Sequence, residues 1–221
     1  MTARRTSFVV GMICAMLVAA VVASDASASS ATAVTSPGGA FTGVTNITGE
    51  SEGNSIFKAT TGGVAIELTA TAVEITPISL FQPPFLENTE FGGVMEAQAE
   101  GSLKFLHVSA NHSCKVNGGS TGTITTQALE AVTRSTTELR FEPVFIPEIA
   151  SFELSGCAIS PLNKKWEISG SVVGTVNGTK IEFTHAGTTA QSTLKFNSSI
   201  NAGFAGILKI RGQNGNPIAF E

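Results

Sequence analysis

The stretch WEISGSVVGTVNGTKIEF, residues 166–183, decides the fold class of this chain. Apolar side chains recur in one alternating phase before the dipeptide Asn177-Gly178, and apolar and charged residues alternate strictly after it. Such alternation is typical of β-strands with one buried face, and Asn-Gly between two alternating runs is the strongest short signal for a hairpin. We therefore expect one long strand containing Gly170 and Gly174, a tight turn and a second strand.

The same alternation recurs along most of the chain, and no segment keeps a helical period. The best helix candidate, 127–132, is too short to assign. Many short strands with turn residues between them favour an all-β fold. We expect about ten strands in a two-sheet antiparallel sandwich, with a closed β-barrel as the alternative. Further alternating segments are 64–69, 139–142, 152–154, 194–196 and 208–210.

The first 28 residues have the organisation of a secretory signal peptide. Arg4 and Arg5 precede an apolar run, 8–22, and small residues with Ala-x-Ala motifs follow. The alternative is an uncleaved membrane anchor, but the run is short for a bilayer span of about 20 residues. We expect a signal peptide at 1–28, a flexible small-residue leader at 29–40 and a single β domain at 41–221.

Cleavage of the signal peptide would place the mature protein outside the cytoplasm, either secreted or in the cell envelope, with no membrane span. It would also leave two cysteines, because Cys14 lies in the apolar run. An even pair in an exported chain predicts a disulfide between Cys114 and Cys157. Closing a loop of about 40 residues contributes roughly 3–4 kcal/mol. The alternative is a pair of buried thiols.

Composition excludes several classes of function. The net charge is −4 without a basic cluster, which argues against a nucleic-acid partner. The one aspartate, Asp25, lies in the signal region, which excludes Asp-x-Asp calcium loops and aspartyl dyads. The chain has no tyrosine and one tryptophan, so the usual stacking platform for sugars is nearly absent. The three histidines show no ligand spacing, and we expect neither a metal nor another cofactor.

Residues 118–122, GGSTG, match the G-x-S-x-G pattern of the serine-hydrolase nucleophile elbow. That elbow requires a strand, a sharp turn and a helix, whereas Ser120 is followed by the β-prone run 123–126. Glycine and serine are also the residues that a tight turn needs. Ser120 is therefore only a weak candidate for a catalytic nucleophile.

The segment 81–91, FQPPFLENTEF, interrupts the strand pattern with a double proline. Prolines stiffen the backbone and are excluded from interior strands. Phe81, Phe85 and Phe91 would then form a rigid apolar surface that binds a partner. The alternative is a flap whose phenylalanines close one end of the domain. A similar proline-flanked segment spans 141–147 and is expected nearby.

Four segments together resemble a group of uncharacterised secreted β-rich proteins from high-GC Gram-positive bacteria. They are Cys114-Lys115-Val116, the TITT strand at 122–129, the second cysteine segment at 155–159 and the GS-x-x-G strand at 168–174. The resemblance covers about half of the chain, from Leu103 to Thr184. It implies an exported bacterial β domain with paired cysteines, and it supplies no catalytic residues.

Three classes of function follow from these observations. The first is an exported, non-enzymatic cell-envelope or extracellular protein with a structural or partner-binding role, whose partner would be an envelope or extracellular component. The second is a secreted hydrolase that uses Ser120 or a pair of glutamates. The third is a pilin-like or adhesin surface subunit, in which the leader and the penultimate Phe220 would exchange between subunits as β-strands.

Overall fold

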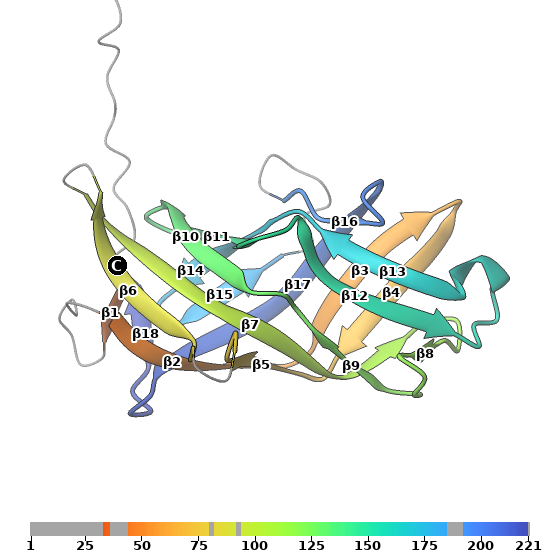
Figure 1. The fold of residues 1–221 in the computed structure, drawn as a ribbon, viewed down its shortest axis with the longest axis horizontal. Coiled ribbons are helices and arrows are strands. Elements are labelled where there is room, and N and C mark those ends of the chain that lie inside the picture. Colours follow the sequence, from red (N-terminus) through yellow and green to blue (C-terminus); the bar gives the residue numbers. More distant parts are fainter. Residues whose placement is uncertain (1–32, 36–43, 80–81, 92–93, 185–191, 221) are drawn as a thin grey trace, which may run out of the picture.

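The structure, a computed structural model, describes residues 33–35, 44–79, 82–91, 94–184 and 192–220. These residues form eighteen strands and one short 3-10 helix (Figure 1), which confirms the all-β prediction. The predicted signal peptide lies outside them. The elements are β1 (Ala33–Thr35), β2 (Val44–Ser51), β3 (Ser55–Thr61), β4 (Val64–Ala70), β5 (Ala72–Thr76), β6 (Phe85–Phe91), β7 (Val94–Ala110), β8 (Lys115–Val116), β9 (Gly122–Thr125), β10 (Leu129–Ser135), β11 (Glu138–Pro143), β12 (Glu148–Ser155), η1 (Ser160–Leu162), β13 (Lys164–Ser169), β14 (Val172–Asn177), β15 (Lys180–Phe183), β16 (Lys195–Phe196), β17 (Ile200–Gly212) and β18 (Ile218–Phe220).

Eight of these strands close into an antiparallel barrel, in the order β2-β6-β7-β10-β11-β14-β15-β17. Pairing between β17 and β2, from Leu208 opposite Ser51 to Gly212 opposite Ile47, closes the ring. The predicted two-sheet sandwich is therefore not confirmed, and the alternative of a closed barrel describes the central region. The predicted number of about ten strands is too low. Alternation shows which face of a strand is buried, but it does not show which distant strands pair.

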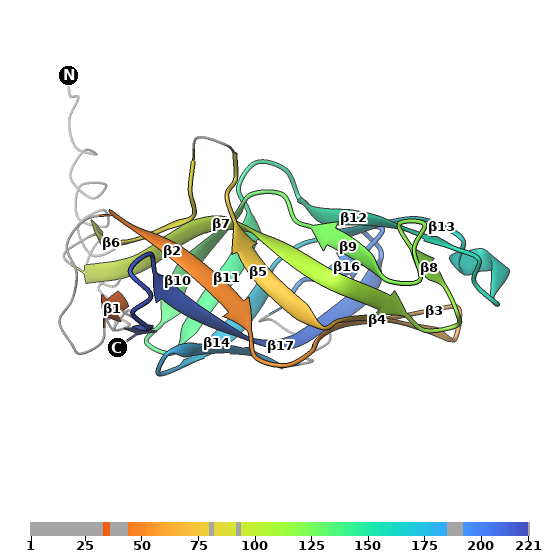
Figure 2. The ribbon, with the colours of Figure 1, turned by 90° about the horizontal axis from the view of Figure 1, so that it is seen from below.

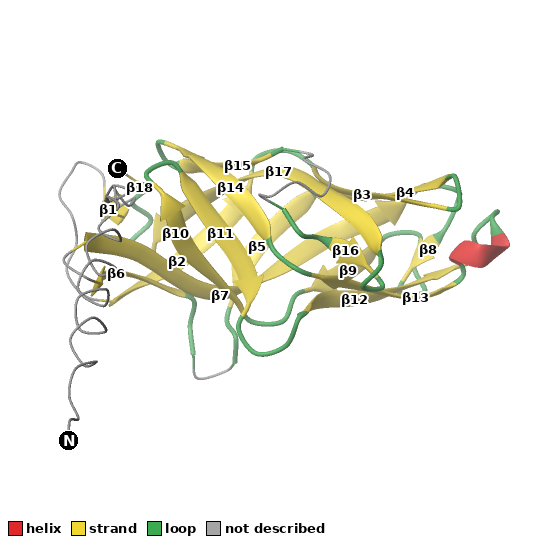
Figure 3. Cartoon of the chain, turned by 90° about the horizontal axis from the view of Figure 1, so that it is seen from above, coloured by secondary structure: helices red, strands yellow, loops and turns green. Residues whose placement is uncertain are grey.

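Two strands are much longer than the others and extend beyond the barrel. β7 has 17 residues and β17 has 13. In the outer region β3 and β4 pair with each other and lie between these two strands. A second layer, β16-β13-β12-β8, begins at β17. Figures 2 and 3 show the two layers on opposite sides of the outer region.

A chain of phenylalanine rings connects the core of the outer region with that of the barrel. The Phe57 and Phe204 ring centroids are 4.6 Å apart. Phe204 and Phe183 follow at 5.1 Å, and Phe183 and Phe141 at 5.2 Å. Such aromatic pairs stabilise a core beyond the area that they bury. The barrel and the outer region therefore share one hydrophobic core.

Strand β7 changes its partners at a β-bulge around His107. Before the bulge, Leu106 pairs with Ala72 of β5, and after it Ser109 pairs with Thr69 of β4. His107 has a left-handed φ of 50°, which is uncommon for a residue other than glycine. Bulges bend strands, and this one marks the point where β7 passes from the barrel region to the outer layer.

The stretch at 166–183 forms two separate strands before its hairpin, not one long strand. β13 ends before Gly170, which has a φ of +100°, and a side chain there would overlap the carbonyl oxygen of Thr193. The chain therefore turns at Gly170 and starts β14 in the barrel. The predicted hairpin is confirmed, because Asn177 pairs with Lys180. Gly178, the first loop residue, has a φ of +61°, as in a II′ turn.

The predicted disulfide between Cys114 and Cys157 is confirmed, with an S–S distance of 2.01 Å. It joins the turn after β7 to the loop after β12. A backbone hydrogen bond of 2.9 Å from Ala158 N–H to the carbonyl oxygen of His112 supports the same connection. Trp166 is fully buried beside this loop, and its indole N–H donates to the carbonyl oxygen of Leu162 at 3.0 Å.

Candidate ligand-binding lumen

The barrel surrounds a lumen that is lined by small side chains on one side and by large side chains on the other. Alternate residues of β7 and β10, namely Ala97, Ala99, Gly101 and Ala131, face it. Larger side chains, among them Leu208, come from β15 and β17, which lie on the opposite side of the ring. An eight-stranded barrel is just wide enough to be filled by side chains or to hold one small ligand. The small residues leave a cavity of about 40 Å³.

The inner end of the lumen is closed by Ile75 of β5. This strand takes the place of β6 between β2 and β7, where Glu74 pairs with Glu50 and Ile75 pairs with Leu103. The Ile75 side chain lies over two glycines of the barrel wall. A Cβ on Gly49 would overlap it, and one on Gly101 would lie 3.1 Å from its Cγ2 atom. The glycines are therefore needed for Ile75 to pack as the floor.

The outer end of the lumen is covered by a two-stranded ribbon formed by β1 and β18. Ala33 pairs with Phe220 and Thr35 with Ile218. β1 contacts β6, and β18 contacts β14, on the opposite side of the ring. Ile218 is fully buried, and the 7% exposed Phe220 lines the cavity. Figures 1 and 3 show the ribbon at the end of the barrel remote from β3 and β4.

The ribbon brings together two segments for which the sequence predicted other roles. Residues 33–35 belong to the predicted flexible leader, yet they form a strand, while the remainder of 29–40 lies outside the described residues. Phe220, considered for strand exchange between subunits, pairs with β1 of its own chain.

A second apolar cavity, of about 30 Å³, lies on the inner side of the floor. Leu103, Leu129 and Phe141 line both cavities and separate them. Rings of the outer core, including those of Phe57 and Phe204, surround the second cavity. The middle of the molecule therefore contains two small apolar cavities, which are separated by these three side chains.

Acidic residues gather on the outer face of the barrel. Glu130 pairs with both Glu100 and Glu142 on the adjacent strands. Burial raises the pKa of the Glu100 carboxyl, and the charges of Glu130 and Glu87 raise it further. Arg140 donates to Glu142 at 2.9 Å and offsets part of this charge. Within the described ranges no group of His, Cys, Asp and Glu side chains could hold a metal ion.

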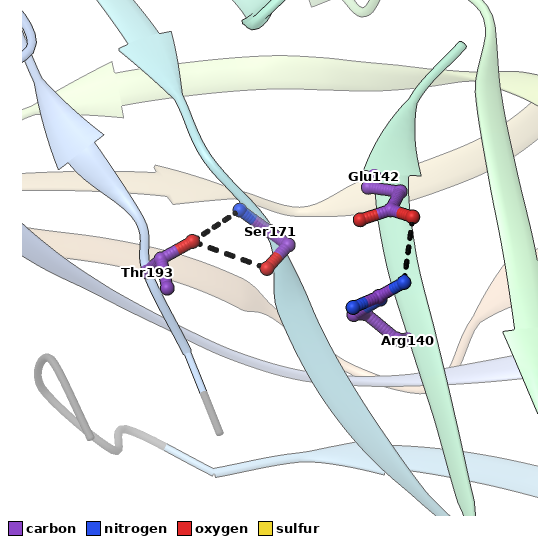
Figure 4. Close-up of polar contacts among 4 residues, drawn as sticks. All are labelled: Arg140, Glu142, Ser171 and Thr193. Atoms are coloured by element: carbon purple, nitrogen blue, oxygen red, sulfur yellow. Dashed lines mark hydrogen bonds and ion pairs between the residues drawn. The ribbon is translucent and has the colours of Figure 1, made fainter. Parts of the chain in front are cut away.

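Two polar pairs lie on neighbouring parts of this surface (Figure 4). The Ser171 backbone N–H donates to the Thr193 hydroxyl oxygen at 3.0 Å, and the two hydroxyls are 3.1 Å apart. Figure 4 shows Arg140 directed toward Glu142 in the second pair. The Ser171–Thr193 contacts join the chain on either side of the β14–β15 hairpin, so we interpret them as structural.

Ser120 lies in an exposed turn between two strands. Val116 and Gly119 form a bridge around Asn117 and Gly118, whose φ values are 51° and 83°. This is the tight turn that the alternative interpretation of GGSTG predicted. The next element is strand β9, so this segment lacks the helix that an elbow directs at an oxyanion. Ser120 as a nucleophile stays a prediction without that structural support.

Of the three phenylalanines of the predicted docking loop, the structure describes the side chain of Phe85 alone. Phe81 and the side chain of Phe91 lie outside the described residues, and Phe85, half-buried, pairs with Glu100 on the outside of the barrel. Among the described large apolar side chains, the exposed ones are Val44 of β2, at 62%, and two in the β11–β12 loop, Phe145 at 82% and Ile146 at 47%.

The β5–β6 and β11–β12 loops leave the barrel at the same level, because Leu129 pairs with both Gly101 and Pro143, and Pro84 packs against Gly101. Figures 2 and 3 show both loops projecting from one side of the molecule. Two strands, β7 and β10, separate the elements that carry the two segments, and binding of a partner by Phe81, Phe85 and Phe91 stays a prediction.

The sequence pattern did not predict the lumen. Ala97, Ala99 and Gly101 alternate with Gln98 and Glu100, which is a half-buried strand pattern. The signal for the lumen was that the inward-facing residues of this strand, Ala97, Ala99 and Gly101, are all small.

No protein-family model, curated protein or solved structure matches this chain. The fold and the lumen define an antiparallel eight-stranded β-barrel protein with a small apolar interior cavity. Within the described residues, no helix combines the length and the apolar character needed to cross a bilayer.

Proposed function

We propose that this chain is an exported, non-enzymatic protein that binds a small apolar molecule in its barrel lumen. The observation that carries the proposal is the incompletely filled lumen, which has an almost wholly apolar wall built from small residues on β7 and β10. Ligand sites in proteins are concave and mostly apolar, and small barrels bind their ligands in this position.

The extracytoplasmic location is part of the same proposal. It is supported by the N-terminal signal pattern and by the disulfide between Cys114 and Cys157, because disulfides persist in oxidising compartments. Export of the chain as a ligand carrier or a ligand-dependent envelope component agrees with the resemblance to secreted bacterial β proteins. The non-enzymatic role is supported by the strand that follows Ser120 where an elbow would need a helix.

The proposal is tested by titrating the mature wild-type protein with toluene, indole and dodecanoate in a calorimeter. We expect saturable binding of at least one compound with a negative heat-capacity change, which marks apolar burial. The blocking variant is Ala131→Leu, whose larger side chain enters the lumen. The matched control is Val132→Leu on the outer face of the same strand.

Binding should be at least tenfold weaker in Ala131→Leu and unchanged in Val132→Leu, with both variants shown to be folded by circular dichroism. Absence of binding to wild type would overturn the proposal. Equal weakening by both variants would show that the compounds bind outside the lumen.

A further inference from the structure

We infer that the ligand is a compact, uncharged molecule about the size of one aromatic ring, and that it binds by lifting the β1–β18 ribbon and replacing the ring of Phe220. This inference rests on the proposed function and adds the class of ligand and the route by which it enters.

The size of the ligand follows from the volume that is free and from the groups that can move. The free space in the lumen is about 40 Å³, whereas an apolar cavity that binds benzene measures about 150 Å³. A side chain must therefore leave before any ring can enter. Among the described lining residues, Phe141 and Phe220 carry rings, and Phe220 is the one that lies on the ribbon. A ring that takes its place would keep the same apolar wall covered.

The floor of the lumen cannot supply that space. Ile75 is held between the backbones of Gly49 and Gly101, and Leu103 beside it borders the second cavity and the aromatic core. Phe141, which also separates the cavities, packs edge-on against Phe183 with centroids 5.2 Å apart. A long acyl chain would have to pass these side chains, so the lumen favours a short, compact molecule.

The ribbon has fewer backbone hydrogen bonds to the barrel than the barrel strands have to one another, and its main anchor is the start of β18, where Arg211 and Pro217 form a bridge and Ile218 is fully buried. Each strand of the ribbon has three residues, and an isolated two-stranded pair is marginally stable in water. The described backbone hydrogen bond from β18 to the barrel runs from Phe220 N–H to the carbonyl oxygen of Gly178 and is long, at 3.3 Å. Barrel strand β15, in contrast, is paired along both edges. The ribbon is therefore the part of the enclosure that can open.

The charge of the ligand follows from the lining. Among the described residues of the wall, the one ionisable side chain is Glu100, and its pairing places it beside Glu130 in the row of glutamates on the outer face. A charged group deep inside the described part of the lumen would therefore face apolar side chains, and burying an unpaired charge is strongly unfavourable. An uncharged ligand avoids this cost.

The test is amide hydrogen exchange measured by NMR on wild-type protein, with and without saturating toluene. The reporter is the Phe220 amide, and the reference is the Ile181 amide in the barrel wall. We expect at least tenfold faster exchange at Phe220 in the complex and no change at Ile181. Saturable binding without a change in exchange at Phe220 would show that the β1–β18 ribbon does not open for the ligand, while the proposed function would stand.

Two variants provide an independent readout. Phe220→Ala removes the competing ring, and Phe220→Leu keeps a smaller plug if the first variant does not fold. We expect toluene to bind at least tenfold more tightly to Phe220→Ala, with an intermediate gain for Phe220→Leu. Unchanged affinity in both folded variants would overturn replacement of the ring. If toluene binds Phe220→Ala but not wild type, the ribbon is a permanent plug. Both the opening of the ribbon and the proposed function would then be wrong.

Discussion

Replacing Ala131 with valine tests whether the lumen is unfilled. Ala131 is 6% exposed and lines the cavity of about 40 Å³. Valine adds two methyl groups, and burial of each is worth about 0.8 kcal/mol. The variant should therefore gain up to about 1.6 kcal/mol of unfolding free energy. At about 2–4 °C per kcal/mol for a domain of this size, Tm should rise by roughly 3–6 °C.

The assay is thermal and urea unfolding of wild type and Ala131→Val, with Ala150→Val as the matched control. Ala150 is 2% exposed and lines neither of the two apolar cavities. Overpacking there should cost about 1–3 kcal/mol. If Ala131→Val is destabilised as much as Ala150→Val, the lumen is already filled and the reasoning is refuted.

Three further predictions concern the disulfide, the barrel wall and the acidic outer face. Replacing Cys114 and Cys157 with serine should lower the unfolding free energy by roughly 3–4 kcal/mol, measured in urea, and a loss below about 1 kcal/mol would contradict the chain-entropy reasoning. Gly174→Val should lose about 1–3 kcal/mol, because its Cβ would overlap Ile181 and lie 2.8 Å from the Phe183 ring; an unchanged urea midpoint would show that the wall adapts. The raised pKa of Glu100 means that the folded state binds this proton more tightly than the unfolded chain, so stability falls as pH rises through the interval between the two pKa values. Glu100→Gln should therefore be more stable than wild type at pH 7 and equal to it at pH 3, and a difference of the opposite sign would contradict the assigned direction.

Local features of this fold could be predicted from the sequence because they depend on neighbouring residues. The alternation around Ile181 places its side chain on a buried face, and Gly178 supplies the positive φ of the hairpin turn between Asn177 and Lys180. The disulfide followed from counting cysteines after the signal peptide. The break at Gly170 was missed, because its cause is the carbonyl oxygen of Thr193, a residue beyond the next hairpin.

Closure of the barrel and the position of the lumen could not be predicted in the same way. The ring closes where Leu208 pairs with Ser51, and alternation is the same whether such strands form a sandwich or a barrel. The sequence suggested strand exchange between subunits for Phe220, but its place over the lumen depends on pairing with Ala33, at the other end of the described chain. Small residues such as Ala99 contribute weakly to any hydrophobic pattern, so the thin wall gave little signal.

The most direct test of the ligand-binding lumen is a crystal structure of the mature wild-type protein in complex with toluene. We expect the ring inside the barrel, in contact with Ala99 and Ala131, with Phe220 turned out of the lumen. A toluene-soaked crystal with Phe220 in place and no ring inside the barrel would contradict it.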